Sequence, residues 1–192
     1  CRDPESCENT STSWGDFFSK NEIVKIDHRN FSFNTYYTLP KPEDAASIPV
    51  FIFHHGAGSS ALTFANLSRH LCDKLEGKCA TFAFDARGHG QTRPIDNSKE
   101  VKYDLDSFVS DFVAVTEEFY CKKLSPVKTK LSLILVGHSL GGSICTSSYI
   151  NFSAYLQKSI LGVAMLDIVE EAAILALAKV DQFLLHTPNV FR

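Results

Sequence analysis

The sequence predicts an α/β fold in which a mostly parallel sheet carries helices on both faces. Two observations lead to this fold class: short, continuous apolar runs alternate with longer amphipathic segments, and motifs rich in glycine and charged residues follow the apolar runs. Continuous apolar strands are typical of parallel sheets that are buried on both faces. Because function gathers at the carboxyl ends of parallel strands, these motifs are the first place to look for chemistry.

The composition predicts a globular protein without a nucleic-acid or membrane partner. Hydrophobic residues make up 44% of the 192 residues and include 15 Phe, enough to build a core. Nineteen Lys and Arg against 22 Asp and Glu give a net charge of −3, with no basic stripe. No apolar run reaches the roughly 20 residues of a membrane helix, so a cytoplasmic or nuclear protein is expected. The six cysteines are irregularly spaced and are expected to be free thiols without a zinc site.

The expected order of elements is an antiparallel pair of strands followed by repeated strand and helix. Residues 1–13 are polar and are expected to form a flexible arm, and residues 14–192 the N-terminal part of a single domain. The antiparallel pair is expected at 22–27 and 31–39. Later strands are expected at 50–54, 80–84, 131–136 and 160–166, each followed by a helix, at about 62–71, 105–119, 140–156 and 170–185.

The strongest chemical signal is the motif Gly-x-Ser-x-Gly at residues 137–141, between an apolar strand and a helix. This context predicts a nucleophile elbow, a strained turn that holds the Ser139 hydroxyl out of the sheet. The N–H of Leu140 opens the following helix and would face the negative charge that develops on an attacked carbonyl. The alternative is a glycine-rich turn in which Ser139 only caps the helix.

A second motif, His-His-Gly-Ala-Gly-Ser-Ser at residues 54–60, directly follows a predicted strand. In hydrolases with this kind of sheet, a His-Gly loop supplies the second oxyanion N–H, which would here belong to Ala57. Residues 56–61 also satisfy the dinucleotide fingerprint Gly-x-Gly-x-x-Gly/Ala, and Asp85 ends the next strand, where a ribose-binding acid would stand. A nucleotide site therefore stays open as an alternative, although it leaves Ser139 unexplained.

Acidic residues end two further strands. Asp85 and Arg87 are expected to fix a tight loop by hydrogen bonds. Asp167 ends the strand after the nucleophile strand, and a carboxylate at that place can orient a histidine toward the serine. Asp167 is therefore the candidate acid of a catalytic triad.

The catalytic base is the missing part. A serine hydroxyl needs a neighbour that takes its proton, and in this fold the histidine follows the acid along the chain. Only His186 follows Asp167, and a helix cap is its expected role. His138 is expected to turn into the fold, and His89 to be a poor substitute base.

With these motifs, the chain resembles the α/β-hydrolase superfamily and, more closely, the fungal protein phosphatase methylesterases. The resemblance runs from about residue 14 to residue 192 and is most specific at Met-Leu-Asp-Ile-Val-Glu-Glu-Ala-Ala, residues 165–173. It implies an α/β-hydrolase fold whose last strands and catalytic-histidine region are absent from this chain. The part from about residue 170 to residue 192 would begin the cap region.

The resemblance implies a serine carboxylesterase that removes the methyl ester from the C-terminal leucine of a type 2A protein phosphatase catalytic subunit. It makes Ser139 the nucleophile and Asp167 the triad acid, the tail of that subunit the partner, and no cofactor or metal necessary. Because the histidine is missing, a second hypothesis is a catalytically dead fragment that binds the phosphatase without demethylating it. The strand at 160–166 is then expected to form an exposed apolar edge.

Overall fold

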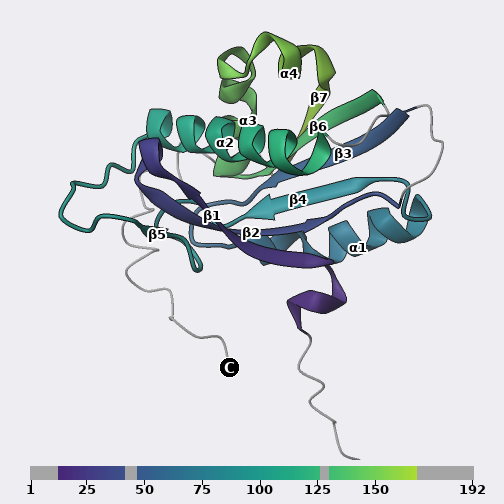
Figure 1. Cartoon of the computed structure of the whole chain (residues 1–192), viewed down its shortest axis with the longest axis horizontal. Coiled ribbons are helices and arrows are strands. Elements are labelled where there is room, and N and C mark those ends of the chain that lie inside the picture. The colour runs from purple at the N-terminus through teal and green to yellow at the C-terminus, as the bar shows by residue number, and fades with distance from the viewer. Residues whose placement is uncertain (1–12, 42–46, 126–129, 168–192) are drawn as a thin grey trace, which may run out of the picture.

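The computed structural model describes residues 13–41, 47–125 and 130–167. A seven-stranded sheet runs through them in the order β1-β2-β4-β3-β6-β7, with β5 paired to β2 (Figure 1). The strands are β1 (Lys20–Ile26), β2 (Phe31–Thr38), β3 (Ser47–His54), β4 (Ala80–Phe84), β5 (Arg93–Pro94), β6 (Lys130–His138) and β7 (Ile160–Leu166). β1, β2 and β4 pair antiparallel, whereas β4, β3, β6 and β7 pair in parallel. The predicted parallel sheet with an N-terminal antiparallel pair is confirmed.

Helices cover both faces of the sheet, as predicted. α1 (Ala65–Lys74) lies on one face, and α2 (Leu105–Phe119) and α3 (Leu140–Ser148) lie on the other (Figure 1). Shorter helical turns are η1 (Trp14–Asp16), η2 (Asp27–Arg29), η3 (Ala61–Phe64), η4 (Tyr120–Leu124) and η5 (Tyr149–Asn151), and α4 (Ala154–Ser159) precedes β7. None of the helices in the described ranges is long and apolar enough to cross a bilayer.

Alternation along the strands divides the core into two layers. In β3, Val50 and Ile52 pack with the α2 and α3 side, whereas Phe53 packs with the α1 side and stacks on Phe64 with ring centroids 4.7 Å apart. Successive strand side chains point to opposite faces, so a strand with a helix on each side must be apolar at nearly every position. This is why the parallel strands are continuous apolar runs in the sequence.

The N-terminal aromatic residues dock on the α1 side of the sheet. Phe18 is buried, and its ring lies 5.7 Å from that of Tyr36. Ser13 caps η1 through a capping box with Asp16. Residues 1–12 and the predicted helix at 170–185 lie outside the described residues.

The single helix predicted over residues 140–156 is wrong, because the chain forms α3 and α4 with a break between them. Phe152 leaves the helical path to pack edge-on against Phe112, with ring centroids 6.0 Å apart. Phe152 adopts an extended conformation, and the N–H of Ser153 donates to the carboxylate of Glu117 at 2.8 Å. Burial of one aromatic ring and a cap supplied from α2 outweigh the helical periodicity, and neither contact is visible in local sequence.

β7 lies at the edge of the described sheet and pairs only with β6. Leu161, Met165 and Leu166 are 70%, 55% and 41% exposed, so the edge strand presents large apolar side chains to solvent. The expectation of an exposed apolar edge at 160–166 is therefore confirmed for this chain.

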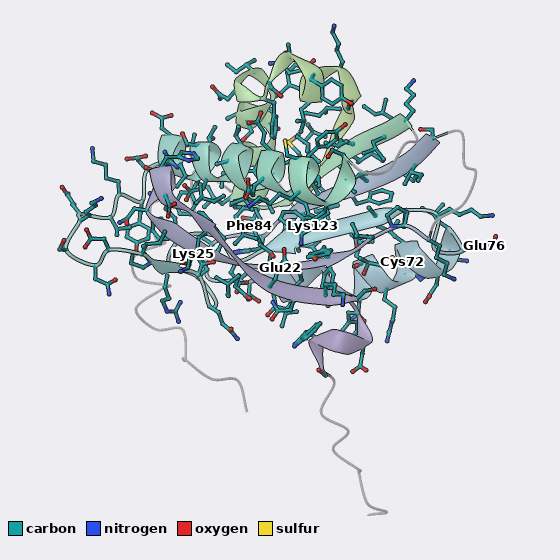
Figure 2. The ribbon with its side chains drawn as sticks, in the orientation of Figure 1. Glu22, Lys25, Cys72, Glu76, Phe84 and Lys123 are labelled. Carbon is teal, nitrogen blue, oxygen red and sulfur yellow. The ribbon has the colours of Figure 1, made fainter. Side chains whose placement is uncertain are left out.

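α1 ends in a Schellman turn built around a residue that is not glycine. The N–H of Gly77 donates to the carbonyl of Cys72 at 2.8 Å, and the N–H of Glu76 to that of Asp73 at 3.2 Å. Glu76 has a φ of 53°, in the left-handed region where a Cβ atom is unfavourable. Its side chain is exposed at the end of α1 (Figure 2).

We expect the Glu76→Gly substitution to raise the free energy of unfolding by about 0.5–1 kcal/mol, because glycine removes the Cβ strain at this C′ position. Urea unfolding followed by circular dichroism measures the change. Glu76→Ala is the matched control, since it removes the same carboxylate and keeps the Cβ atom. An equal gain in both variants would show that charge, and not backbone strain, limits stability here.

Candidate functional site

Ser139 lies in a strained turn between β6 and α3, at the place where the sequence predicts a nucleophile elbow. Its φ of 51° and ψ of −122° lie outside the regions that residues with a side chain ordinarily occupy, so the backbone is strained. Two hydrogen bonds of 2.9 Å hold the turn: Ser139 N–H donates to the carbonyl of Leu166, and Gly142 N–H donates to the carbonyl of Ser139. Ser139 itself is exposed at this edge.

The two motif glycines let strand and helix approach closely enough for this turn. A Cβ atom on Gly137 would lie 2.3 Å from the carbonyl oxygen of Gly141, and one on Gly141 would lie 2.1 Å from that of His54. Both contacts are with backbone atoms, which cannot move aside as a flexible side chain can. α3 therefore begins in direct contact with the carboxyl ends of β3 and β6.

The loop after β3 lies against the elbow, as the oxyanion prediction requires. A Cβ atom on Gly56 would lie 3.2 Å from Cβ of Ser139. Ala57 follows at the surface, and its N–H donates to no hydrogen bond within the described ranges. Leu140 is the first residue of α3, where an N–H has no intrahelical acceptor. The structure thus brings both predicted donors to the edge that carries Ser139.

Hydrogen bonds join the loop after β4 to the segment that follows β3. Asp85 is 2% exposed, and its carboxylate accepts hydrogen bonds from Asn34 Nδ2 at 2.9 Å, Ala61 N–H at 2.8 Å and Gln91 N–H at 2.9 Å. A buried carboxylate with three donors is not accessible to a ribose hydroxyl, so the dinucleotide alternative is wrong for Asp85. The predicted structural role of this motif is confirmed.

Arg87 of the same loop enters a buried ion pair that the sequence analysis missed. Its guanidinium donates to both oxygens of Asp111, Nε to Oδ2 at 2.6 Å and Nη2 to Oδ1 at 2.8 Å. Arg29 adds a third bond to Asp111 Oδ1 at 2.8 Å. The signal was present in the sequence, because Asp111 interrupts the apolar face of α2 between Phe108 and Phe112. A buried charge at such a place requires a partner.

Two histidines beside the elbow are held by hydrogen bonds to the backbone. The N–H of Gly58 donates to His89 Nε2 at 3.0 Å, and the N–H of Ala86 donates to His55 Nε2 at 3.0 Å. Each ring must therefore carry its proton on Nδ1, which donates to a carbonyl at 2.9 Å in His89 and 2.7 Å in His55. Their lone pairs are already used, which excludes both rings, as placed here, from taking the serine proton.

Burial makes the rings of His54 and His55 hard to protonate. His54 lies between Phe84 and Phe112 with ring centroids 5.3 Å and 5.5 Å away, and burial lowers its pKa to about 3. Burial likewise lowers the pKa of His55 to about 4. Both rings are therefore uncharged at neutral pH, and both lie buried where β3 ends and the following loop begins.

Asp167 comes to the elbow through the pairing of β6 with β7. His138 pairs with Leu166, so the next residues along the two strands, Ser139 and Asp167, leave the sheet side by side. Asp167 has a φ of 55°, and its side chain is 82% exposed. A carboxylate so open to solvent has room beside it for a second group.

His138 behaves only partly as predicted. Its Nδ1 is buried without a hydrogen-bond partner in the described structure, so one nitrogen does turn into the fold. Its Nε2 instead faces Asp167 Oδ2 at 3.6 Å, a contact that the sequence analysis missed. No hydrogen bond joins His138 to the Ser139 hydroxyl among the described residues. His186 lies outside those residues.

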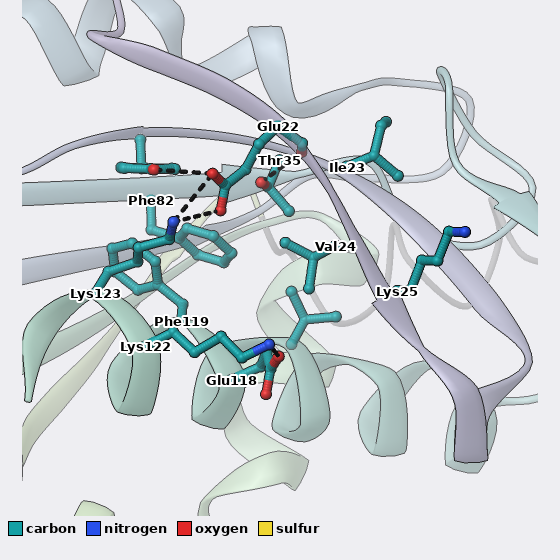
Figure 3. A pocket seen from close by; sticks show the side chains of 12 residues that line it. Glu22, Ile23, Val24, Lys25, Thr35, Phe82, Glu118, Phe119, Lys122 and Lys123 are labelled. Atoms are coloured by element: carbon teal, nitrogen blue, oxygen red, sulfur yellow. Dashed lines mark hydrogen bonds and ion pairs between the residues drawn. The ribbon is translucent and has the colours of Figure 1, made fainter.

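A separate cavity of about 460 Å³ opens between β1 and α2 (Figure 3). Val24, Phe82 and Phe119 form apolar walls, and Lys123 pairs with Glu22 at 2.8 Å across one side of it. None of the four candidate site residues lines this cavity. The candidate active site therefore lies outside this cavity.

Comparison with known proteins gives a consistent result. A family model described as "Alpha/beta hydrolase family" matches residues 51–191. Protein phosphatase methylesterase 1 of Saccharomyces cerevisiae is 55% identical over 183 residues, covering 93% of this chain and 46% of the relative. The protein of the same name from Kluyveromyces lactis is 51% identical, covering 97% and 48%. The chain thus spans about half the length of the curated relatives it matches, and the predicted resemblance to methylesterases is confirmed.

Solved structures show the same fold at low sequence identity. A laboratory evolved variant of potato epoxide hydrolase superposes with a TM-score of 0.57 at 17% identity, covering 78% of this chain and 39% of that one. Potato epoxide hydrolase I gives a TM-score of 0.55 at 15% identity, covering 76% and 39%. These structures support the fold alone.

We expect Gly141→Ala to lower the free energy of unfolding by about 3 kcal/mol, because its Cβ atom would collide with a backbone carbonyl. Gly162→Ala is the matched control, since a Cβ atom there meets nothing within 4 Å. Chemical unfolding of both variants measures the difference. A Gly141→Ala variant as stable as the control would contradict the close contact of α3 with β3.

We expect stability to fall as the pH is lowered from about 7 toward 4. The unfolded chain binds protons at an ordinary histidine pKa of about 6.5, whereas folded His54 and His55 do not until about pH 3 and 4. Each histidine therefore contributes a slope of up to about 1.4 kcal/mol per pH unit in this window.

His54→Asn removes one of these titrations and keeps a donor in place of Nδ1, so urea unfolding at pH 7, 6 and 5 should show a shallower loss. The exposed His70→Gln is the control and should leave the wild-type slope unchanged. Identical slopes in all three proteins would refute the assignment of the pH dependence to the buried ring.

Proposed function

We propose that this chain, which belongs to the α/β-hydrolase family, carries the nucleophile half of a serine carboxylesterase site. The substrate we propose is the methyl ester on the C-terminal leucine of a type 2A protein phosphatase catalytic subunit, and that subunit's tail is the partner. Support for the substrate comes from the methylesterase relatives, of which three are more than 50% identical over at least 93% of this chain.

The observation that carries the chemical proposal is the strained backbone of Ser139, with a φ of 51°. Strain of this kind persists only where surrounding contacts impose it, and here it brings a hydroxyl to an exposed edge. A serine that merely capped α3 would place its side chain on a first-turn N–H, yet Ser139 makes no such hydrogen bond. The elbow therefore favours a nucleophile over a cap.

In the proposed reaction, Ser139 Oγ attacks the ester carbonyl carbon while a base takes the hydroxyl proton. The carbonyl oxygen becomes an alkoxide, which the N–H groups of Ala57 and Leu140 stabilise. The alkoxide collapses, the bond to the methoxy group breaks, and that group leaves as methanol after receiving the proton. Water then attacks the acyl-serine ester and releases the free carboxylate, and Ser139 recovers its proton.

Asp167 is the proposed acid that orients and stabilises the base. Its carboxylate is open to solvent beside Ser139, and His138 Nε2 lies 3.6 Å from its Oδ2. The Nε2 lone pairs of His55 and His89 already accept hydrogen bonds from backbone N–H groups. We therefore propose that the base is a histidine from outside the described residues.

A second candidate function is binding the phosphatase tail without hydrolysis, which is favoured because no histidine of the described residues is hydrogen-bonded to the Ser139 hydroxyl. Loss of the triad histidine typically costs about 10⁶ in turnover, while the oxyanion hole and binding retain about 10³–10⁴ over water. A chain without that histidine would therefore bind the ester but hydrolyse it very slowly.

We expect a fluorophosphonate probe to label Ser139 slowly, and added imidazole to speed the labelling severalfold by acting as a free base. Mass spectrometry of tryptic peptides locates the label. Ser139→Ala should abolish labelling, whereas Ser143→Ala, an exposed serine one turn later in α3, should not change it. Release of methanol from a peptide ending in leucine methyl ester should follow the same pattern.

Each other outcome is informative. Rapid labelling of Ser139 without imidazole would show that the chain holds its own base and would remove the second candidate. Labelling that survives Ser139→Ala would overturn the nucleophile assignment. Hydrolysis of unrelated methyl esters at the same rate would overturn the proposed substrate.

A further inference from the structure

Two cysteine thiols meet at the end of α1, away from the candidate active site. Cys72 lies in the last turn of the helix, and Cys79 lies one residue before β4. Their sulfur atoms are 3.8 Å apart, and both cysteines are free thiols. The Schellman turn around Glu76 reverses the chain and brings the two residues together, while Cys121 and Cys145 have no sulfur neighbour in the described structure.

We propose that Cys72 and Cys79 form a redox modification site, which a peroxide oxidises to a reversible intramolecular disulfide. A disulfide requires its sulfur atoms about 2 Å apart, so the two thiols must close by less than 2 Å from their present separation. Cys72 stands in the last helical turn, next to the connection that leads to Cys79. Side-chain rotation and a small adjustment of this connection can supply that movement.

The two thiols are unequal in a way that assigns a role to each. Cys79 is fully buried, whereas Cys72 is only half-buried, so an oxidant from solvent meets Cys72 first. The Cys79 S–H donates a hydrogen bond to the Cys72 sulfur and lowers the pKa of Cys72 to about 7. The same bond, together with burial, raises the pKa of Cys79. Cys72 is thus the attacking thiolate and Cys79 the resolving thiol.

The chemistry balances with hydrogen peroxide as the oxidant. The Cys72 thiolate attacks one peroxide oxygen, the O–O bond breaks, and hydroxide leaves and is protonated to water, which gives Cys72 sulfenic acid. The Cys79 sulfur then attacks the Cys72 sulfur, the S–O bond breaks, and a second water leaves with the Cys79 proton. Two thiols are oxidised by two electrons, and one peroxide is reduced to two waters. Thiol–disulfide exchange with an added dithiol restores both thiols.

Tryptic mapping tests the proposal directly on the full chain. Trypsin cuts after Lys74 and Lys78, so Cys72 and Cys79 fall on separate peptides, residues 70–74 and 79–87, which only a disulfide can join. After treatment of the reduced protein with hydrogen peroxide and blocking of remaining thiols, we expect these peptides linked, with a mass about 2 Da below their sum. Dithiothreitol should separate them again.

Single variants distinguish the two roles. Cys72→Ser should leave Cys79 reduced, because that sulfur is buried. Cys79→Ser should leave the Cys72 sulfenic acid without a resolving thiol, so that dimedone traps it. Cys121→Ala removes an exposed thiol elsewhere and is the matched control, with linkage unchanged.

Three results would overturn the proposal. The peptides could remain separate while other thiols oxidise, Cys72 could link to a cysteine other than Cys79, or Cys79→Ser could give no trapped Cys72. Unfolding measured by circular dichroism before oxidation confirms that each variant retains its fold, so a negative result cannot arise from a misfolded protein.

Discussion

The candidate site depends on one close contact, between the first turn of α3 and the carbonyl group that ends β3. Gly141 has no Cβ atom, and a Cβ atom added there would lie only 2.1 Å from the carbonyl oxygen of His54. Because the helix starts this close to the sheet, the chain between β6 and α3 has no room for a relaxed turn. The strain at Ser139 is the direct result.

A rigid polar layer supports this strained turn. Asp85, His55 and His89 connect the loops after β3 and β4 through hydrogen bonds to backbone N–H groups. Such hydrogen bonds fix the backbone N–H groups of these loops in place, which is what the proposed oxyanion hole requires. The neutrality of the buried histidines matters as well, because an uncharged ring can accept from one N–H and donate to one carbonyl at the same time.

Elements with a strong local pattern could be predicted from the sequence. The apolar strands, the helix at 105–119 and the elbow were all placed correctly, since burial on both faces and the glycine spacing leave few alternatives. The break before α4 could not be predicted, because it depends on Phe152 meeting Phe112 and on a cap from Glu117. The contact of His138 with Asp167 depends on strand pairing, which periodicity alone does not reveal.

β7, one of the two edge strands of the described sheet, also determines where two candidate site residues lie. The carbonyl of Leu166 accepts a hydrogen bond from the N–H of Ser139, and Asp167 directly follows Leu166. The positions of Ser139 and Asp167 therefore both depend on the end of β7. The other edge of β7 has no strand beside it within the described ranges. A change in how β7 pairs with β6 would therefore move Ser139 and Asp167 together.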